Sequence, residues 1–357
     1  MPRESFYLKV PKTEGEIALR AVDKLGLTDK TLQIQKIEDD AICIPLIRQP
    51  DDSELTSLRR QMPGLCSGTS VFLEKRRQEK TLVEALIDEL PLHLMASLPR
   101  ALDVVGDIAI LEIPPELETY KAVLGEAIMK THRGVRVVLA KAGAVTGTYR
   151  LRNFEFIAGE RRTATLYKEF GCTYHVDVAK AYFSPRLGHE HERVALLVGS
   201  GETVVDLFAG VGPFAVLIAK SCGDAKVYAI DINADAVELL KKNARLNRVE
   251  NRVFPIIGDA RQVVSNGLTG IADRVIMNLP ETANAFIDVA CRAIKQSGGV
   301  AHFYCFIRSP QTVKDMERQF SEAVQNSGRK VTEFLHAKPV RETAPHEYQI
   351  VLDAQIL

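Results

Sequence analysis

The second half of the chain alternates short apolar runs with stretches that carry apolar residues at helical spacing. This alternation is typical of strands and helices that build a mostly parallel, doubly wound sheet. A long helix at 309–327 and two last strands near 330–338 and 347–356 complete the pattern. The predicted strands before them are 203–210, 226–232, 253–260, 273–280 and 300–307, with helices near 213–221, 234–247 and 283–295 and a shorter piece near 260–266.

The beginning of the chain lacks this alternation and predicts a separate small module. Residues 15–27 have the spacing of a helix closed by Gly26, and residues 32–49 predict two short strands joined by an acidic turn at 38–40. The stretch 62–80 is charged and poorly periodic. We therefore interpret it as a connection between domains.

The region after this connection mixes helices and strands. The predicted elements are helices at 81–90 and 118–132 and strands at 100–114, 136–143, 154–160, 163–171 and 173–179. We expect three parts: a small α/β N-terminal domain at 1–75, an α+β middle domain at 80–180, and an α/β domain with the doubly wound sheet at 181–357.

Composition narrows the class of protein. Of the 357 residues, 46% are hydrophobic and 26% are charged, which is the balance of a soluble globular protein. No apolar run approaches the roughly 20 residues needed to span a bilayer, and the N-terminus has no apolar signal core. The six cysteines form no CxxC pair, which argues against a metal site and against a disulfide framework. We expect a cytoplasmic protein without a metal ion.

The distribution of charged residues along the chain leads to a different inference from the net charge. Lys and Arg number 46, as do Asp and Glu, and a net charge of zero weakens any nucleic-acid hypothesis. Residues 120–168, however, contain ten Lys or Arg against three Glu. A local positive surface can attract phosphate while the whole chain stays neutral. A plain solvated face remains the alternative reading of this cluster.

The sequence VVDLFAGVGPF at 204–214 predicts a strand, a glycine turn and a helix start. Gly210 and Gly212, with Phe208 and Ala209 before them, let the backbone approach a ligand closely. A dinucleotide fingerprint would need a third glycine, which is missing. Asp206 lies in the strand, where it would repel a pyrophosphate and attract a cation. These electrostatics favour S-adenosylmethionine over a nicotinamide dinucleotide.

Two further acids follow the next two strands. Asp231, beside Ile232, ends the second strand, where a carboxylate can accept the ribose hydroxyls of a nucleoside. Asp259, beside Ala260, follows the third strand and could accept from the adenine amino group. Each acid could instead simply cap the next helix. Together with the glycine turn, the acids favour the cofactor site.

The fourth strand of the doubly wound part runs into Asn278-Leu279-Pro280-Glu281. An Asn side chain with a neighbouring carbonyl matches the donor and acceptor of a nucleobase amide edge. Pro280 restricts Leu279 to an extended backbone. We therefore expect Asn278 to hold the target base, with a helix cap as the plain alternative.

These segments, and others along the chain, are similar to those of the archaeal and eukaryal tRNA (guanine-37-N1)-methyltransferases, which are class I S-adenosylmethionine enzymes. The combination of YFSPRL with NLP is the most specific part of the match. The matching segments are DVVGDIAIL (103–111), NFEFIAGE (153–160), VDVAKAYFSPRLGHEHERV (176–194), VVDLFAGVGPF (204–214), YAIDIN (228–233), KKNARLN (241–247), VIMNLPETANAFID (275–288) and APHEYQIVLD (344–353).

The resemblance implies a class I Rossmann-like catalytic domain, a middle domain, and an N-terminal domain that checks the outer corner of tRNA. It implies that Glu190 is the general base and that Arg150 faces O6 of the guanine in the anticodon loop. Removing the N1 proton spreads charge onto O6, which a fixed guanidinium stabilises. The implied lining of the cofactor or base comprises Tyr182, Pro185 and Arg186, with Asn278 and Pro280 from the NLP motif.

Plainer readings stand beside these roles. Glu190 falls in the first turn of an expected helix, where the dipole alone favours an acid, and Arg150 could be a phosphate contact. We expect His189 and His191 to face solvent without a role. Rival functions are a methyltransferase for another RNA base, one for a wyosine-pathway intermediate at the same tRNA position, a small-molecule methyltransferase, and an RNA-binding protein with a degenerate methyltransferase fold. We expect a monomer with no obligate protein partner.

Overall fold

The computed structural model describes residues 2–37, 41–74, 81–99, 101–146 and 151–357. The chain forms two compact units, Met1–Lys80 and Thr81–Leu357. Each unit has its own core, and each is described separately below.

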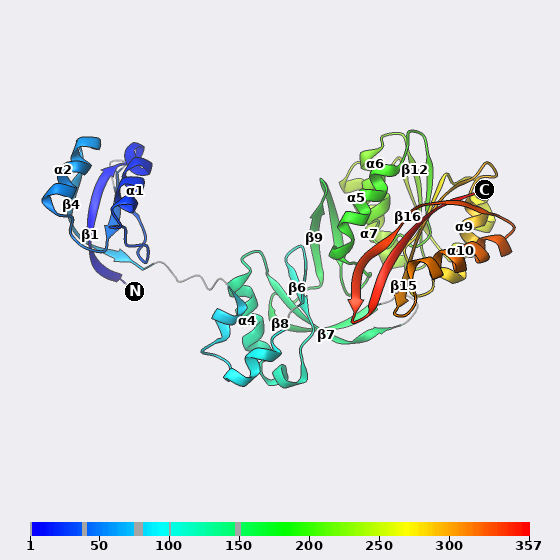
Figure 1. Ribbon diagram of the computed structural model, residues 1–357, viewed down its shortest axis with the longest axis horizontal. Helices are drawn as coiled ribbons and strands as arrows, with labels where there is room; N and C mark the ends of the chain where they lie inside the picture. The colour runs from blue at the N-terminus through cyan, green and yellow to red at the C-terminus, as the bar shows by residue number, and fades with distance from the viewer. Residues whose placement is uncertain (1, 38–40, 75–80, 100, 147–150) are drawn as a thin grey trace. The chain divides into compact units, whose positions relative to one another are not determined.

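The N-terminal unit contains a four-stranded antiparallel sheet with the order β2-β3-β1-β4, together with the α-helices α1 and α2 (Figure 1). The predicted connection at 62–80 was wrong in part, because it contains β4, which pairs with β1 through neighbours such as Phe6 and Thr69. Most β4 side chains are exposed at this edge, so the strand has little apolar periodicity. The elements are β1 Pro2–Pro11, α1 Gly15–Lys24, β2 Gln35–Ile37, β3 Ala41–Leu46, α2 Asp52–Gln61 and β4 Cys66–Leu73.

The second unit begins with a mixed sheet of order β5-β6-β7-β8, on which α4 packs. The single strand predicted at 100–114 is a hairpin, because Gly106 adopts a φ of +60° and turns the chain back. The elements are α3 Leu82–Leu86, the 3₁₀ turns η2 Leu92–Ser97 and η3 Pro115–Tyr120, β5 Leu102–Val105, β6 Ile108–Leu111, α4 Lys121–Thr131, β7 Val137–Thr146 and β8 Leu151–Gly159.

The next hairpin, β9 Ala164–Glu169 with β10 Cys172–Asp177, is tied to helix α7 Ala234–Leu246. The side chain of Asn247 bonds both backbone groups of Thr173, and the side chain of Asn243 bonds both backbone groups of His175. One apolar cluster contains buried residues of β6, of this hairpin and of α6. The predicted domain boundary near 180 therefore falls inside the second compact unit, after a hairpin that packs on the C-terminal part.

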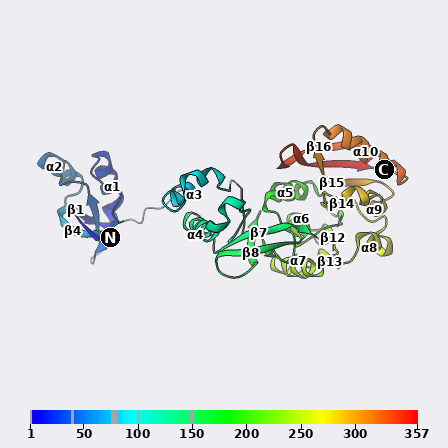
Figure 2. The same cartoon turned by 90° about the horizontal axis from the view of Figure 1, so that it is seen from below.

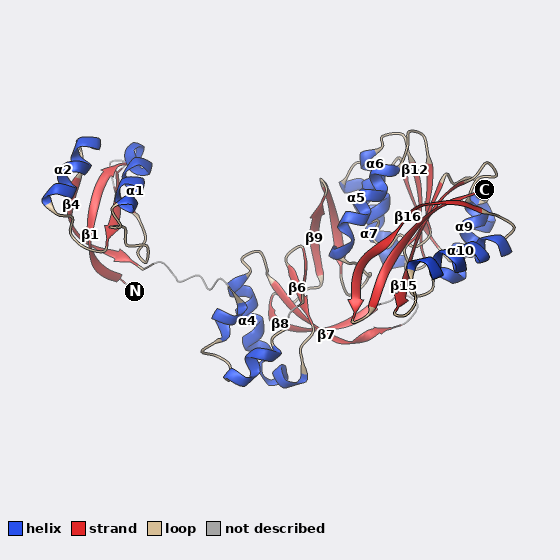
Figure 3. Ribbon diagram, in the orientation of Figure 1, coloured by secondary structure: helices blue, strands red, loops and turns tan. Residues whose placement is uncertain are grey.

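The C-terminal part is the predicted doubly wound sheet, with the strand order β13-β12-β11-β14-β15-β17-β16. Strands β11 to β15 are parallel, whereas β17 runs antiparallel to both β15 and β16 (Figure 3). The strands are β11 Thr203–Asp206, β12 Lys226–Asp231, β13 Val253–Ile257, β14 Arg274–Met277, β15 Gly299–Arg308, β16 Val331–Ala344 and β17 Glu347–Ile356.

Helices cover both faces of this sheet. The buried residues of α5, α6 and α7 belong to one apolar cluster and those of α8, α9 and α10 to another, and Figures 1 and 2 place the two sets on opposite sides. The strand order reverses between β11 and β14, which leaves a crevice at their carboxyl ends, where ligands of such sheets bind. The helices not yet bounded are α5 Gly188–Leu197, α6 Pro213–Ser221, α8 Ala260–Val263, α9 Ile287–Ala293 and α10 Val313–Asn326.

Candidate functional site

A cavity lies at the carboxyl ends of β11, β12 and β14, and the segment before α5 closes it from another side. Most of the residues predicted to bind the cofactor meet on its wall. These are Tyr182, Phe208, Ala209, Gly210, Asp231, Ile232, Asp259, Ala260 and Asn278. Residues that lie far apart in the sequence are thus brought together at the switch point of the sheet.

The two glycines of the turn have different roles. Gly210 adopts a φ of +56° and donates its backbone N–H to the Asp231 carboxylate at 2.7 Å, and a Cβ there would meet only the Tyr182 carbonyl, at 3.7 Å. Gly212 adopts a φ of +87°, and the position of its missing Cβ is filled by Leu240 of α7. Gly210 therefore borders the cavity, whereas Gly212 is outside its lining and serves helix packing.

Asp206 lies behind the wall and does not line the cavity. Its side chain is buried, and this burial raises the pKa of the carboxyl group to about 7. The Phe208 N–H partly offsets the effect, and the nearby charge of Asp231 adds to it. Asp206, which was predicted to bind the cofactor, therefore does not face the cavity directly.

Asp231 and Asp259 both reach the wall, and only one of them caps a helix. Asp231 accepts the backbone N–H groups of Gly210 and Asn233, and its burial raises the pKa of the carboxyl group. The cap of α7 is Asn233 instead. Asp259 accepts the Arg261 N–H at 2.8 Å as the N-cap of α8 while also lining the cavity.

Asn278 directly follows β14 and carries an unsatisfied acceptor. Its Oδ1 is buried and has no hydrogen-bond partner among the residues that the structure describes. Buried polar atoms are rarely left unpaired, so this oxygen is available to a hydrogen-bond donor in the cavity. Leu279 also lines the cavity, whereas Pro280 lies beyond its lining, in the following turn.

Glu190 lies on α5 and does not line the cavity. Its carboxylate accepts the Tyr304 hydroxyl at 2.8 Å and the Arg193 guanidinium at 2.9 to 3.1 Å. Arg193 also pairs with Asp353, and Asp353 is 2.8 Å from His302 Nδ1. Glu190 is therefore a member of a largely buried network that joins α5 to β15 and β17.

Arg186 lies outside the cofactor cavity. Its Nε donates to the Asp103 carboxylate at 2.6 Å, in a second hollow that is also lined by Arg152 and Arg341. Tyr182 borders both hollows. Arg150, the residue predicted to face O6, lies outside the described residues. Arg341 was missed from the sequence because β16 shows no motif at that position.

His191 is the main residue that the sequence analysis misplaced. It is only 1% exposed and lines the cofactor cavity, so the expectation that it faces solvent was wrong. The reason is visible in the spacing, because buried residues recur on α5 and at its ends at Leu187, His191, Val194 and Val198. His189, in contrast, is exposed as expected.

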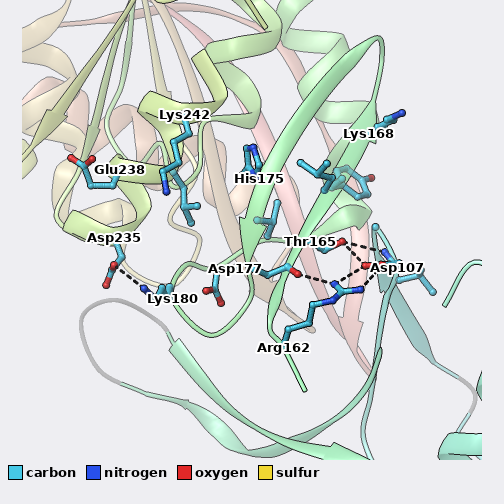
Figure 4. A pocket seen from close by; sticks show the side chains of 17 residues that line it. Asp107, Arg162, Thr165, Lys168, His175, Asp177, Lys180, Asp235, Glu238 and Lys242 are labelled. Carbon is cyan, nitrogen blue, oxygen red and sulfur yellow. Dashed lines mark hydrogen bonds and ion pairs between the residues drawn. The ribbon is translucent and has the colours of Figure 1, made fainter. Parts of the chain in front are cut away.

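A larger cavity of about 1150 Å³ lies between the β5–β6 turn, the β9–β10 hairpin and α7. Figure 4 shows that several of its charges pair with one another. Arg162 binds Asp107 through both guanidinium ends, and Lys180 lies 3.6 Å from Asp235. None of the glycine-turn residues lines this cavity. We therefore assign it no part in cofactor binding.

The pairing also changes the view of the basic cluster at 120–168. Lys121 contacts Glu118 and Glu155, and Arg162 contacts Asp107. Part of the positive charge counted in the sequence is thus neutralised locally.

In the described part of the chain, no helix is long and apolar enough to cross a membrane, and no cluster of three metal-binding side chains occurs.

Two family models match the second compact unit. The model described as the TRM5/TYW2 methyltransferase domain matches residues 165–332, and the model described as the TYW2 N-terminal domain matches residues 82–163. The two matched ranges meet at the first residue of β9, Ala164. This agrees with the packing of the β9–β10 hairpin on α7.

Curated and solved relatives extend the match to the N-terminal unit. The chain is 37% identical over 352 residues to the tRNA (guanine(37)-N(1))-methyltransferase Trm5b of Pyrococcus abyssi, covering 99% of each chain. It is 33% identical to the tRNA 4-demethylwyosine(37)-methyltransferase Taw21 of Saccharolobus solfataricus, covering 77% of this chain and 98% of the relative. A solved complex of aTrm5 and tRNALeu is 34% identical with a TM-score of 0.76, over 99% of this chain and 100% of that one.

The wall of the cavity fits S-adenosylmethionine. The unpaired Asn278 Oδ1 can accept a hydrogen bond from the amino group of the methionine part of the cofactor. Asp231 and Asp259 can accept hydrogen bonds from its ribose and its adenine. Related structures have been solved with AdoMet and with adenosine. The chain therefore belongs to the TRM5/TYW2 methyltransferase family, and its cofactor is S-adenosylmethionine.

Proposed function

We propose that this chain transfers the methyl group of S-adenosylmethionine to N1 of the guanosine at position 37 of tRNA. The observation that carries the proposal is the extent of the match. The relative named for guanine-37 N1 methylation aligns with 99% of the chain, N-terminal unit included, whereas the relative named for 4-demethylwyosine methylation aligns with only 77%. The Asn278-Leu279-Pro280 sequence after β14 also supports a plain guanosine.

S-adenosylmethionine supplies an electrophilic methyl group, and the protein must make N1 of the guanine nucleophilic. We propose that Glu190 accepts the N1 proton and that Arg150 stabilises the charge on O6. Tyr304 donates to Glu190 Oε2, whereas Oε1 accepts only from Arg193 among the described residues. Oε1 is therefore the oxygen with more freedom to take a proton. Asn278 Oδ1 accepts a hydrogen bond from the amino group of the cofactor.

The substrate side of the proposal involves two parts of the chain. We propose that the second hollow, which contains Lys141, Arg152, Arg186 and Arg341, receives the anticodon loop next to the cofactor cavity. Tyr182 borders both spaces, so a splayed-out base between them would be adjacent to the methyl donor. We further propose that the N-terminal unit contacts the outer corner of tRNA and that the enzyme acts as a cytoplasmic monomer.

The test is methyl transfer to tRNA transcripts that differ only at position 37. With labelled S-adenosylmethionine, we expect 1-methylguanosine from the transcript with guanosine and no product from the transcript with adenosine. A product on both transcripts, or a different methylated nucleoside, would contradict the proposal. The tRNA complex of the related aTrm5 supports the choice of tRNA over a small molecule.

A second candidate is methylation of a wyosine intermediate at the same position. The identity of 33% to Taw21 and the match to the TYW2 N-terminal domain favour it. Assays on tRNA that already carries 4-demethylwyosine separate the two, because a Taw21-like enzyme would methylate that tRNA faster than the guanosine transcript. Equal inactivity on both substrates, with the cofactor bound, would point to another RNA base.

A further inference from the structure

A buried histidine on the wall of the cofactor cavity has no role in the chemistry proposed above. His191 Nδ1 lies 2.8 Å from Glu169 Oε1, and its ring packs edge-on against Phe214, with 4.6 Å between the ring centroids. A carboxylate can only accept a hydrogen bond, so Nδ1 carries a proton. The other ring nitrogen, Nε2, is thereby available to a ligand in the cavity.

The wall is otherwise poor in positive charge. Among the described residues that line the cavity, His191 is the only one whose side chain can become cationic, while Asp231 and Asp259 are acidic. S-adenosylmethionine carries an ammonium and a sulfonium but also a carboxylate. The acids and Asn278 Oδ1 suit the groups that donate hydrogen bonds. The carboxylate needs a donor or a cation, which the acidic side of the wall does not supply.

The Glu169 carboxylate reduces the free-energy cost of a charged His191 side chain in the protein interior. Its side chain is buried, and its Oε2 has no hydrogen-bond partner among the described residues. A buried cation is costly unless a counter-charge lies beside it, and Glu169 is that counter-charge for His191. Phe214 belongs to the first turn of the nine-residue helix α6, whose positive end also favours an anion.

We propose that His191 binds the carboxylate of the amino-acid part of S-adenosylmethionine. Glu169 acts as a positioning residue that holds the ring and balances its charge. The cavity thereby has a cationic side at α5 and the start of α6 and an acceptor side at β12, α8 and Asn278. This role concerns cofactor binding alone and is independent of which tRNA nucleoside is methylated.

The experiment compares two ligands on two proteins by isothermal titration calorimetry. S-adenosylhomocysteine has the carboxylate, and its decarboxylated analogue differs only in lacking it. We expect His191→Gln to weaken binding of S-adenosylhomocysteine by roughly tenfold or more, as for loss of a charge-assisted hydrogen bond, and to leave binding of the analogue unchanged. Equal weakening of both ligands, or no weakening, would overturn the proposal.

Two further variants keep the test decisive. His189→Gln changes an exposed histidine two residues away and should leave both affinities unchanged. Glu169→Gln keeps the shape of the side chain and removes the counter-charge. It should weaken binding of S-adenosylhomocysteine, but not of the decarboxylated analogue, and by less than His191→Gln does. If His191→Gln does not fold, the Glu169→Gln comparison decides, and a loss that is equal for both ligands rejects the role.

Discussion

The two walls of the cofactor cavity are built in different ways. On the sheet side, Gly210 and Asn278 follow parallel strands and Asp231 is the last residue of one, so their positions are set by where the strands end. On the α5 side, the partner of the wall residue His191 lies far away in the chain, as Glu169 on β9, and Glu190 behind this wall likewise accepts from the distant Tyr304 on β15. The sheet wall thus depends on backbone conformation, whereas the α5 wall depends on tertiary pairs of polar side chains.

This difference has an electrostatic consequence. On the sheet side, burial works against the charge of Asp206 and raises the pKa of its carboxyl group. On the α5 side, burial of Asp353 acts in the same direction but is outweighed by His302 and Arg193, which lower the pKa to about 2. Burial thus disfavours the charge of Asp206 behind the sheet wall, whereas Asp353, which pairs with Arg193 of α5, keeps its charge through partners within the protein.

The largest expected effect is a loss of catalytic rate without a loss of cofactor affinity. Glu190→Gln should slow methyl transfer by about 10²- to 10⁴-fold, the usual contribution of a general base. The affinity for S-adenosylmethionine should be unchanged, because Glu190 does not line the cavity. Single-turnover rates and calorimetry measure the two effects. Glu192→Gln on the same helix is the control, and a similar loss for both variants would show that the helix, not the base, was affected.

Asp206→Asn should stabilise the protein without cofactor. Because the folded-state pKa of Asp206 is about 7, ionisation destabilises the fold as the pH rises from about 4 to 7. The variant should gain up to about 4 kcal/mol above pH 7 and close to nothing below pH 4. Urea unfolding across this pH range measures the difference. A gain that is independent of pH would mean that the pKa of the carboxyl group is the same in the folded and unfolded states.

The two glycines of the sheet wall should differ in what they tolerate. Gly212→Ala adds strain at a positive φ and a clash with Leu240, which together cost about 2 to 4 kcal/mol of unfolding free energy. Gly210→Ala adds only the strain, about 1 to 2 kcal/mol, because the space beside it is open. Its main effect should instead be weaker cofactor binding. Equal destabilisation would contradict the division of roles between them.

The effect of Asp353→Asn on the unfolding free energy should have the opposite sign to that of Asp206→Asn, with its own pH dependence. The folded-state pKa of about 2 lies below the unfolded value near 3.8, so the charged form contributes about 2 kcal/mol above pH 4. This contribution is lost as the pH falls through 2. The wild-type advantage in unfolding free energy should therefore shrink between pH 4 and pH 2.5. An advantage that stays constant would place the effect in packing rather than in charge.

Much of the fold and one wall of the site could be predicted from the sequence. The β/α alternation located β11 to β15 and the helices between them, because buried parallel strands are short apolar runs between turn residues. Elements with little apolar periodicity were missed, such as the edge strand β4. The 100–114 run was read as one strand because apolar residues continue through the turn at Gly106.

The sequence by itself determined the doubly wound sheet, the glycine turn and the acids at the strand ends, because these features follow from local backbone preferences and from the position of a residue after its strand. Only the tertiary structure decided that Gly212 packs on Leu240, that Arg186 pairs with Asp103, and that His191 is buried against Glu169. Such pairs join segments separated in the chain, and local spacing carries no signal of which distant charge will lie beside a side chain.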